Sequence, residues 1–61
     1  MRFREAVRMV EDGGWYFVRA VGSHHHFKHP TKPGKVTIPN HNGKDIDPIT
    51  VKSIRKQAGL K

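Results

Sequence analysis

Apolar residues recur at helical spacing near the start of the chain. They occupy positions i, i+3, i+4 and i+7 of one segment: Phe3, Ala6, Val7 and Val10. Charged residues fill the positions between them, so the segment is predicted to form a short amphipathic helix with one apolar face. The pair Gly13-Gly14 follows directly and is predicted to end this helix.

A second helix is predicted near the end of the chain. Asp47 is a favoured N-cap residue and Pro48 a favoured first helical residue. The apolar face of this helix has three members: Val51, Ile54 and Ala58. Gly59 is suited to the left-handed conformation that closes a helix, and Leu60 is placed to fold back as the hydrophobic contact that follows.

The middle of the chain predicts three β-strands. Residues 15–21 are rich in aromatic and β-branched side chains, and Gly22-Ser23 is a favoured pair for a two-residue type II′ hairpin turn. The returning strand covers 24–29, and a turn at 32–34 leads to a third strand at 35–38. Two amphipathic helices must bury their apolar faces against one face of this sheet. The sequence therefore predicts an α+β fold, an αβββα two-layer sandwich in the order of double-stranded-RNA-binding domains.

The two-residue turn decides which side chains share a face of the hairpin. Val21 then faces His24, and the register continues until Val18 faces Phe27. The face predicted to pack against the helices carries Val18, Ala20 and Phe27, with Tyr16, His25 and His29 at its margins. The face predicted to be open carries Phe17, Arg19, His24, His26 and Lys28.

Composition narrows the functions that the chain can have. Its 61 residues predict a single domain, 1–61, which is too small for a large enclosed cofactor cavity. There is no cysteine, which excludes disulfides, a thiolate nucleophile and cysteine-ligated zinc. No apolar run approaches the roughly 20 residues that span a bilayer. We therefore expect no cofactor and no membrane partner, and the cytoplasm is the simplest compartment.

The charge of the chain points to an anionic partner. Twelve Lys and Arg stand against five Asp and Glu, a net charge of +7, and nucleic acid leads the candidates. Histidines beside Arg19 and Lys28 can transfer protons while the cations stabilise charge on a phosphate. RNA carries its own nucleophile, the 2′-hydroxyl, so such a site can cleave RNA without a metal and should leave DNA intact.

Several side chains keep alternative interpretations. The histidines can be ordinary strand residues on a solvated face, or metal ligands, with His24 and His26 on one face and His29 and His41 nearby. Trp15 is expected in the core. Phe17 can either join the core or stack on an unpaired base.

A set of motifs covers nearly the whole chain and resembles the HicA family of toxins. The motifs are Gly13-Gly14-Trp15, the run GSHHHFKHP from Gly22 to Pro30, Val36-Thr37-Ile38-Pro39 and Lys56-Gln57-Ala58-Gly59-Leu60. The resemblance implies an mRNA interferase with a double-stranded-RNA-binding-domain-like fold, inhibited by a HicB antitoxin that covers its active site. It also implies that the histidine after Gly22-Ser23, which is His24, is catalytic. The chain departs from the family at Ile49, where many members have a small residue.

The sequence thus predicts an endoribonuclease that cleaves mRNA. His24 is the expected catalytic residue, Gly22 and Ser23 shape the turn before it, and the expected RNA-binding residues are Arg19, His26 and Lys28. No residue is assigned to a metal. Two alternatives stay open: a noncatalytic RNA-binding module of the same fold, and a decayed toxin that acts only in the complex with its antitoxin.

Overall fold

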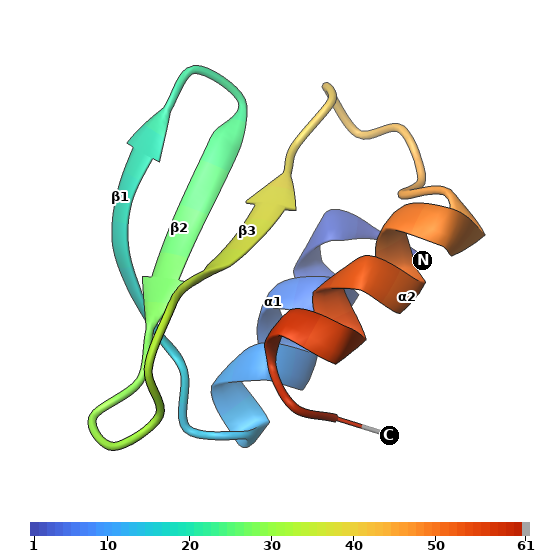
Figure 1. Ribbon diagram of the computed structural model, residues 1–61. Coiled ribbons are helices and arrows are strands. Elements are labelled where there is room, and N and C mark those ends of the chain that lie inside the picture. The colour runs from blue at the N-terminus through green and yellow to red at the C-terminus, as the bar shows by residue number, and fades with distance from the viewer. Residues whose placement is uncertain (61) are drawn as a thin grey trace.

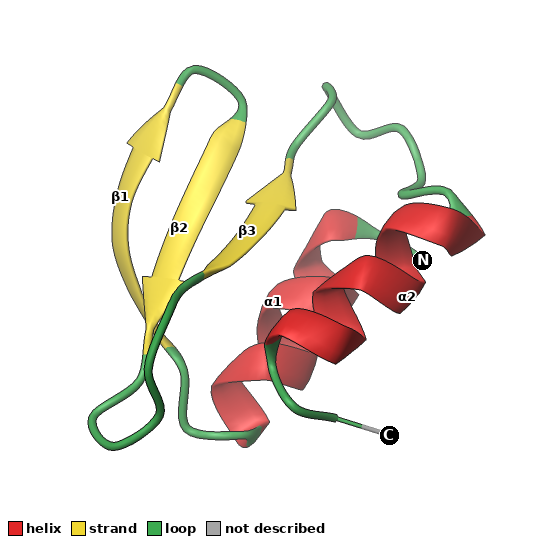
Figure 2. Cartoon of the chain, in the orientation of Figure 1, coloured by secondary structure: helices red, strands yellow, loops and turns green. Residues whose placement is uncertain are grey.

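A computed structural model describes residues 1–60, which form two helices and three strands. In chain order these are α1 (Phe3–Asp12), β1 (Tyr16–Val21), β2 (His24–Lys28), β3 (Val36–Pro39) and α2 (Pro48–Gln57). The strands form one antiparallel sheet in the order β1-β2-β3. Both helices lie on the same side of it, next to β3 (Figure 1), and the helical and strand layers are seen separately in Figure 2. The predicted αβββα sandwich is confirmed. The predicted domain 1–61 also included Lys61, which lies outside the described residues.

Helix α1 begins and ends where the sequence predicts. The Glu5 carboxylate accepts a hydrogen bond from the backbone N–H of Arg2 at 3.0 Å, which satisfies one of the free donors at the start of the helix. Gly14, just after the helix, has φ +95°, a conformation that strongly favours glycine. A Cβ atom on Gly14 would lie only 2.7 Å from Nε2 of His29, so the close approach of this loop to His29 also requires glycine.

Helix α2 is capped at both ends by local interactions. Oδ1 of Asp47 accepts from the backbone N–H of Thr50 at 2.9 Å, as expected of an N-cap. At the other end Gly59 has φ +71°, and the N–H of Leu60 donates to the carbonyl of Arg55 at 2.8 Å, which is the long hydrogen bond of a Schellman motif. Leu60 then packs against the core. The predicted start and end of this helix are confirmed.

One apolar core joins the helices to β2 and β3. Its buried members are Ala6, Val10, Trp15, Phe27, Val36, Ile38, Ile46, Ile54 and Ala58. Trp15 is 3% exposed, and its indole Nε1–H donates to the carbonyl of Ala58 at 3.2 Å, so its one polar atom is satisfied inside the core. The predicted core positions are therefore confirmed for Trp15 and for Ala6, Val10, Ile54 and Ala58, whereas Phe3, Val7 and Val51 are half-buried and pack against the core.

The hairpin follows the predicted register only near its turn. Val21 pairs with His24 and Arg19 with His26 as expected, but a β-bulge between Phe17 and Arg19 shifts the register beyond that point. Phe17 therefore pairs with Phe27, and the predicted pairing of Val18 with Phe27 is wrong. Because residues directly opposite each other share a face, the bulge moves Phe17 to the face of Phe27 and Tyr16 to the opposite face.

The prediction that β1 helps to fill the core is wrong. Every residue of β1 is exposed, and Val18, predicted to pack against the helices, is 45% exposed. Ala20 lies opposite His25 on the predicted face but is also exposed. The physical reason is that both helices pack next to β3 at the other edge of the sheet, so β1 extends past the layer that the helices cover (Figure 1).

Candidate functional site

The hairpin turn positions the first histidine of β2. Gly22 has φ +59°, the sign that a type II′ turn requires at this position, and a Cβ atom there would meet nothing within 4 Å. The carbonyl of Ser23 accepts a hydrogen bond from the backbone N–H of Asn40 at 2.7 Å, which ties the turn to the end of β3. His24 follows directly, opposite Val21, and is exposed.

A small hollow lies on the sheet face that the helices leave open. It encloses about 280 Å³ and is lined by Val18, Arg19, His26, Lys28 and Lys35. The structure thus brings together the three predicted RNA-binding residues, Arg19, His26 and Lys28. His24 does not line the hollow but lies two residues from His26 on the same strand, and therefore on the same face. No carboxylate of residues 1–60 lines the hollow, which makes it suited to a phosphate group.

His26 is the most constrained histidine of this face. Its Nδ1 lies 3.0 Å from Oγ1 of Thr37, its partner across the β2–β3 pairing. Partial burial of the ring, and then the positive charges of Lys35 and Arg19, lower the pKa of His26 below its ordinary value of 6.5. Both causes favour the uncharged form of the imidazole, although cations surround it.

Two other histidines have structural roles on the covered side. The His25 ring lies 4.8 Å from the Phe3 ring and 5.8 Å from the Phe17 ring, measured between centroids. Nε2 of His29 is 3.1 Å from the carbonyl of Gly13, and its Nδ1 accepts from the backbone N–H of Thr31 at 3.1 Å. An Nδ1 that accepts leaves a proton on Nε2, so the His29 ring donates from Nε2 to the carbonyl of Gly13.

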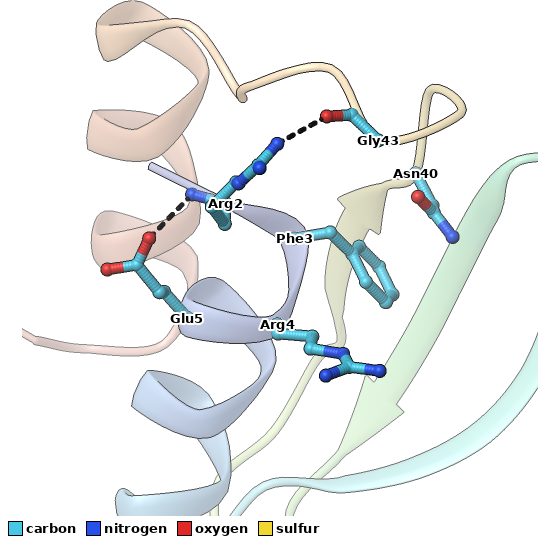
Figure 3. A pocket seen from close by; sticks show the side chains of 6 residues that line it. All are labelled: Arg2, Phe3, Arg4, Glu5, Asn40 and Gly43. Atoms are coloured by element: carbon cyan, nitrogen blue, oxygen red, sulfur yellow. Dashed lines mark hydrogen bonds between the residues drawn. The ribbon is translucent and has the colours of Figure 1, made fainter.

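A larger hollow of about 590 Å³ lies at the start of α1 and is shown in Figure 3. It is lined by Arg2, Phe3, Arg4, Glu5, Asn40 and Gly43. The Arg2 guanidinium donates to the carbonyl of Gly43 at 2.7 Å. One of the two guanidinium groups that line this hollow is therefore already engaged within the chain. The wall also carries the Glu5 carboxylate, which opposes an anionic ligand. We therefore place the candidate site in the smaller hollow, which has only cationic and neutral groups.

Comparison with known families decides the relationship of the chain. Residues 3–60 match the family described as "HicA toxin of bacterial toxin-antitoxin". The chain belongs to the HicA toxin family. This HicA-family chain is therefore a member of a toxin–antitoxin system, for which the family implies a HicB antitoxin as partner. A search of curated proteins finds no match for it.

Two residues that line the hollow of this HicA-family chain, Val18 and Lys35, are not among the site residues that the sequence predicts. Lys35 directly precedes β3. When the antiparallel pairing of Phe27 with Val36 is extended by one residue, Lys35 lies opposite Lys28. The register of β2 and β3 is therefore the signal that could have predicted Lys35 as a site residue. Val18 reaches the hollow because of the bulge, for which the local sequence has no marker such as glycine.

The described residues hold neither a metal-binding cluster nor a membrane-spanning helix. Within residues 1–60, no three His, Asp or Glu side chains lie close enough together to hold a metal ion. Over the same residues, neither helix is long and apolar enough to cross a membrane.

Phe17 flanks the core on the covered face. It is 50% exposed, and its ring centroid lies 5.8 Å from that of Phe27. Phe17 is therefore not on the open face with the cations.

Proposed function

We propose that this HicA-family chain is an endoribonuclease, an mRNA interferase that cleaves mRNA and so arrests translation as the toxin of a type II system. One observation carries the proposal. The open sheet face combines a pair of histidines, His24 and His26, with a hollow that, in the described part of the chain, is lined by three cations and no carboxylate. This combination provides proton transfer and charge stabilisation at the same place, which is what cleavage of a phosphodiester needs.

The chemistry uses the nucleophile that RNA supplies. The 2′-hydroxyl attacks the adjacent phosphorus, so the protein has to move protons, align the strand and stabilise the negative charge that develops on phosphate. We assign proton transfer to His24 and contacts with the phosphate backbone to Arg19, His26 and Lys28. No metal or other cofactor is assigned a role, and DNA, which lacks the 2′-hydroxyl, is not expected to be cleaved.

We also propose that HicB inhibits the toxin by covering this open face. Three exposed apolar side chains of β1 border the basic residues there: Tyr16, Val18 and Val21 are 50%, 45% and 58% exposed. An apolar border around a charged centre suits a protein partner, which buries apolar area while its acidic groups meet the cations. The proposed place of action is the cytoplasm, where mRNA is translated.

Substitution of His24 tests the proposed activity. The purified protein and its His24→Ala variant are incubated with a defined single-stranded RNA in excess EDTA, and the fragment ends are analysed. We expect only the parent to cleave and to leave 2′,3′-cyclic phosphate ends. Because His24 is exposed, the variant should keep its free energy of unfolding within about 0.5 kcal/mol.

The other outcomes of this experiment identify the alternatives. Equal cleavage by both proteins would remove His24 from the mechanism. RNA binding without cleavage by the parent would support a noncatalytic RNA-binding module. Growth arrest on expression that is rescued by co-expressed HicB, and that is absent for His24→Ala, would contradict a decayed toxin.

A further inference from the structure

His26 is held by a chain of hydrogen bonds that runs from the open face to helix α2. Oγ1 of Thr37 lies 3.0 Å from Nδ1 of His26, and the backbone N–H of Thr37 donates to Oε1 of Gln57 at 3.0 Å. Nε2 of Gln57 in turn donates to Oγ of Ser53 at 3.1 Å. Thr37, the residue of β3 that contacts the His26 ring, is therefore also hydrogen-bonded to α2 on the side of β3 that faces away from β2.

This arrangement leaves one nitrogen of His26 for chemistry. Nδ1 is occupied by Thr37, so Nε2 is the ring nitrogen without a partner among the described residues, and the ring lines the hollow. When Nδ1 carries the ring proton and donates it to the hydroxyl of Thr37, Nε2 presents a lone pair. A lone pair at this position can accept a proton from a substrate hydroxyl.

The electrostatic surroundings keep this lone pair available. Two cations face the His26 ring, Arg19 from β1 and Lys35 from the loop before β3. Its neighbours on β2 are His24, His25 and Lys28. Among residues 1–60, helix α2 is linked to the ring through the neutral side chain of Gln57, which accepts from the backbone N–H of Thr37 in β3. Partial burial, followed by the charges of Lys35 and Arg19 and then of the two neighbouring histidines, lowers the pKa of His26, which favours the neutral ring.

We propose that His26 is the general base of the reaction and that His24 is the general acid, a division of roles that rests on the proposed ribonuclease function and makes the 2′-hydroxyl, in place of phosphate, the group of the RNA that His26 contacts. Nε2 of His26 takes the proton of the 2′-hydroxyl as the 2′-oxygen forms its bond to phosphorus. The bond from phosphorus to the 5′-oxygen breaks, and His24 gives that oxygen a proton. The products are a 2′,3′-cyclic phosphate and a free 5′-hydroxyl, so atoms and charges balance, with one proton accepted and one donated.

The same geometry assigns Thr37 and Gln57 as positioning residues. Thr37 holds Nδ1 and so directs Nε2 into the hollow, while Gln57 holds the backbone of Thr37. His25 is excluded from the proton transfer, because its ring is on the other face between Phe3 and Phe17. It therefore provides a matched control for loss of an imidazole from the same strand.

A substrate that needs no general acid separates the two histidines. The substrates are a single-stranded RNA and the same RNA with sulfur in place of the 5′-oxygen at the cleaved bond, since a thiolate leaves without a proton. We expect His26→Asn to lower kcat by about 10²- to 10⁴-fold on both substrates. His24→Ala should lose activity on the normal RNA and regain most of it on the sulfur substrate.

The pH profile tests the electrostatic part of the proposal. For the parent, kcat/KM should fall as pH drops through the lowered pKa of His26, at a pH below 6.5, because the base becomes protonated. Lys35→Ala removes a cation that lowers this pKa, so the acidic limb should move to higher pH. Lys52→Ala, which removes a lysine from α2, is the matched control and should leave the limb in place.

Thr37 variants test the positioning role. Thr37→Val should lower kcat with KM unchanged, and Thr37→Ser, which keeps the hydroxyl, should restore it. His25→Asn should lower Tm through lost ring contacts but keep the kcat of the parent at pH 7 or above. Circular dichroism and the affinity for a cleavage-resistant 2′-deoxy analogue show whether each variant is folded and still binds.

The outcomes separate this inference from the proposed function. A parent protein that binds but does not cleave RNA would overturn both. A parent that cleaves, with a His26→Asn variant that is folded and has the kcat and acidic limb of the parent, would overturn only the role of His26. Rescue of His26→Asn by the sulfur substrate would also overturn it, because His26 would then be the acid.

Discussion

The two edges of the sheet have opposite surroundings. β3 contacts both helices, and its Val36 and Ile38 have no exposed surface, whereas all six residues of β1 are exposed. β2 lies between them, with Phe27 in the core and His24 and Lys28 exposed. The difference shows how a chain this short divides its residues: one edge supplies the burial that stabilises the fold, and the other stays exposed to solvent.

The same substitution on two paired residues tests this contrast most strongly. Phe27 is 1% exposed and its partner Phe17 is 50% exposed. Phe27→Ala should cost about 3 to 5 kcal/mol, most of the stability that a domain of this size has. Phe17→Ala should cost about 0.5 to 1.5 kcal/mol, the value of an aromatic pair contact. Denaturant unfolding measures both, and equal losses would contradict the division.

A smaller effect on folding is expected at the start of α2. Asp47→Ala should lower Tm by several degrees, because Oδ1 and Oδ2 accept from the N–H and the hydroxyl of Thr50, both at 2.9 Å. Asp45→Ala is the matched control, since Asp45 makes only an exposed ion pair with Arg2 at 3.7 Å. Thermal unfolding followed by circular dichroism measures both changes.

The effect of Asp47 should depend on pH with a definite sign. The hydrogen bonds from Thr50 lower the pKa of the Asp47 carboxyl below 3.8 in the folded protein. Its contribution is therefore fully present above pH 3.8 and is lost as pH falls through the lower folded pKa. The difference in Tm between parent and Asp47→Ala should shrink in acid, and a difference that stays constant would argue against the charged cap.

The smallest effect on folding is expected for a substitution in the hollow of the open sheet face, which should change RNA binding and not stability. Lys28→Ala should leave Tm unchanged but weaken RNA binding and lower the slope of log K against log salt by about one unit, for one lost phosphate contact. Lys52→Ala on α2 should leave the slope unchanged. Fluorescence anisotropy with a cleavage-resistant RNA measures both, and an unchanged slope for Lys28→Ala would exclude it as a phosphate contact.

Ile49 shows where a departure from the family pattern has no structural cost. It is 82% exposed, and the cap formed by Asp47 is intact beside it, so the start of α2 is not disturbed. An exposed isoleucine at this position is a contact available to another protein.

The helices were predictable because their signals are local. The apolar spacing that includes Ala6 and Val10, the N-cap Asp47 and the C-terminal Gly59 each act within a few residues of their own position. The bulge was not predictable from the hairpin sequence. An extra residue at Val18 changes the face of Phe17 and Tyr16, and only packing against β2 and the core selects where it is placed.

The sequence alone determined the order of elements, the Gly22-Ser23 turn, the excess of positive charge and the placement of His24 and His26 on one face, because these depend on composition, spacing and the two-residue period of a strand. The tertiary structure alone decided which edge the helices cover, that Lys35 joins the hollow, and that Thr37 holds His26. These features depend on contacts between residues far apart in the chain, and such contacts form only when the elements pack together.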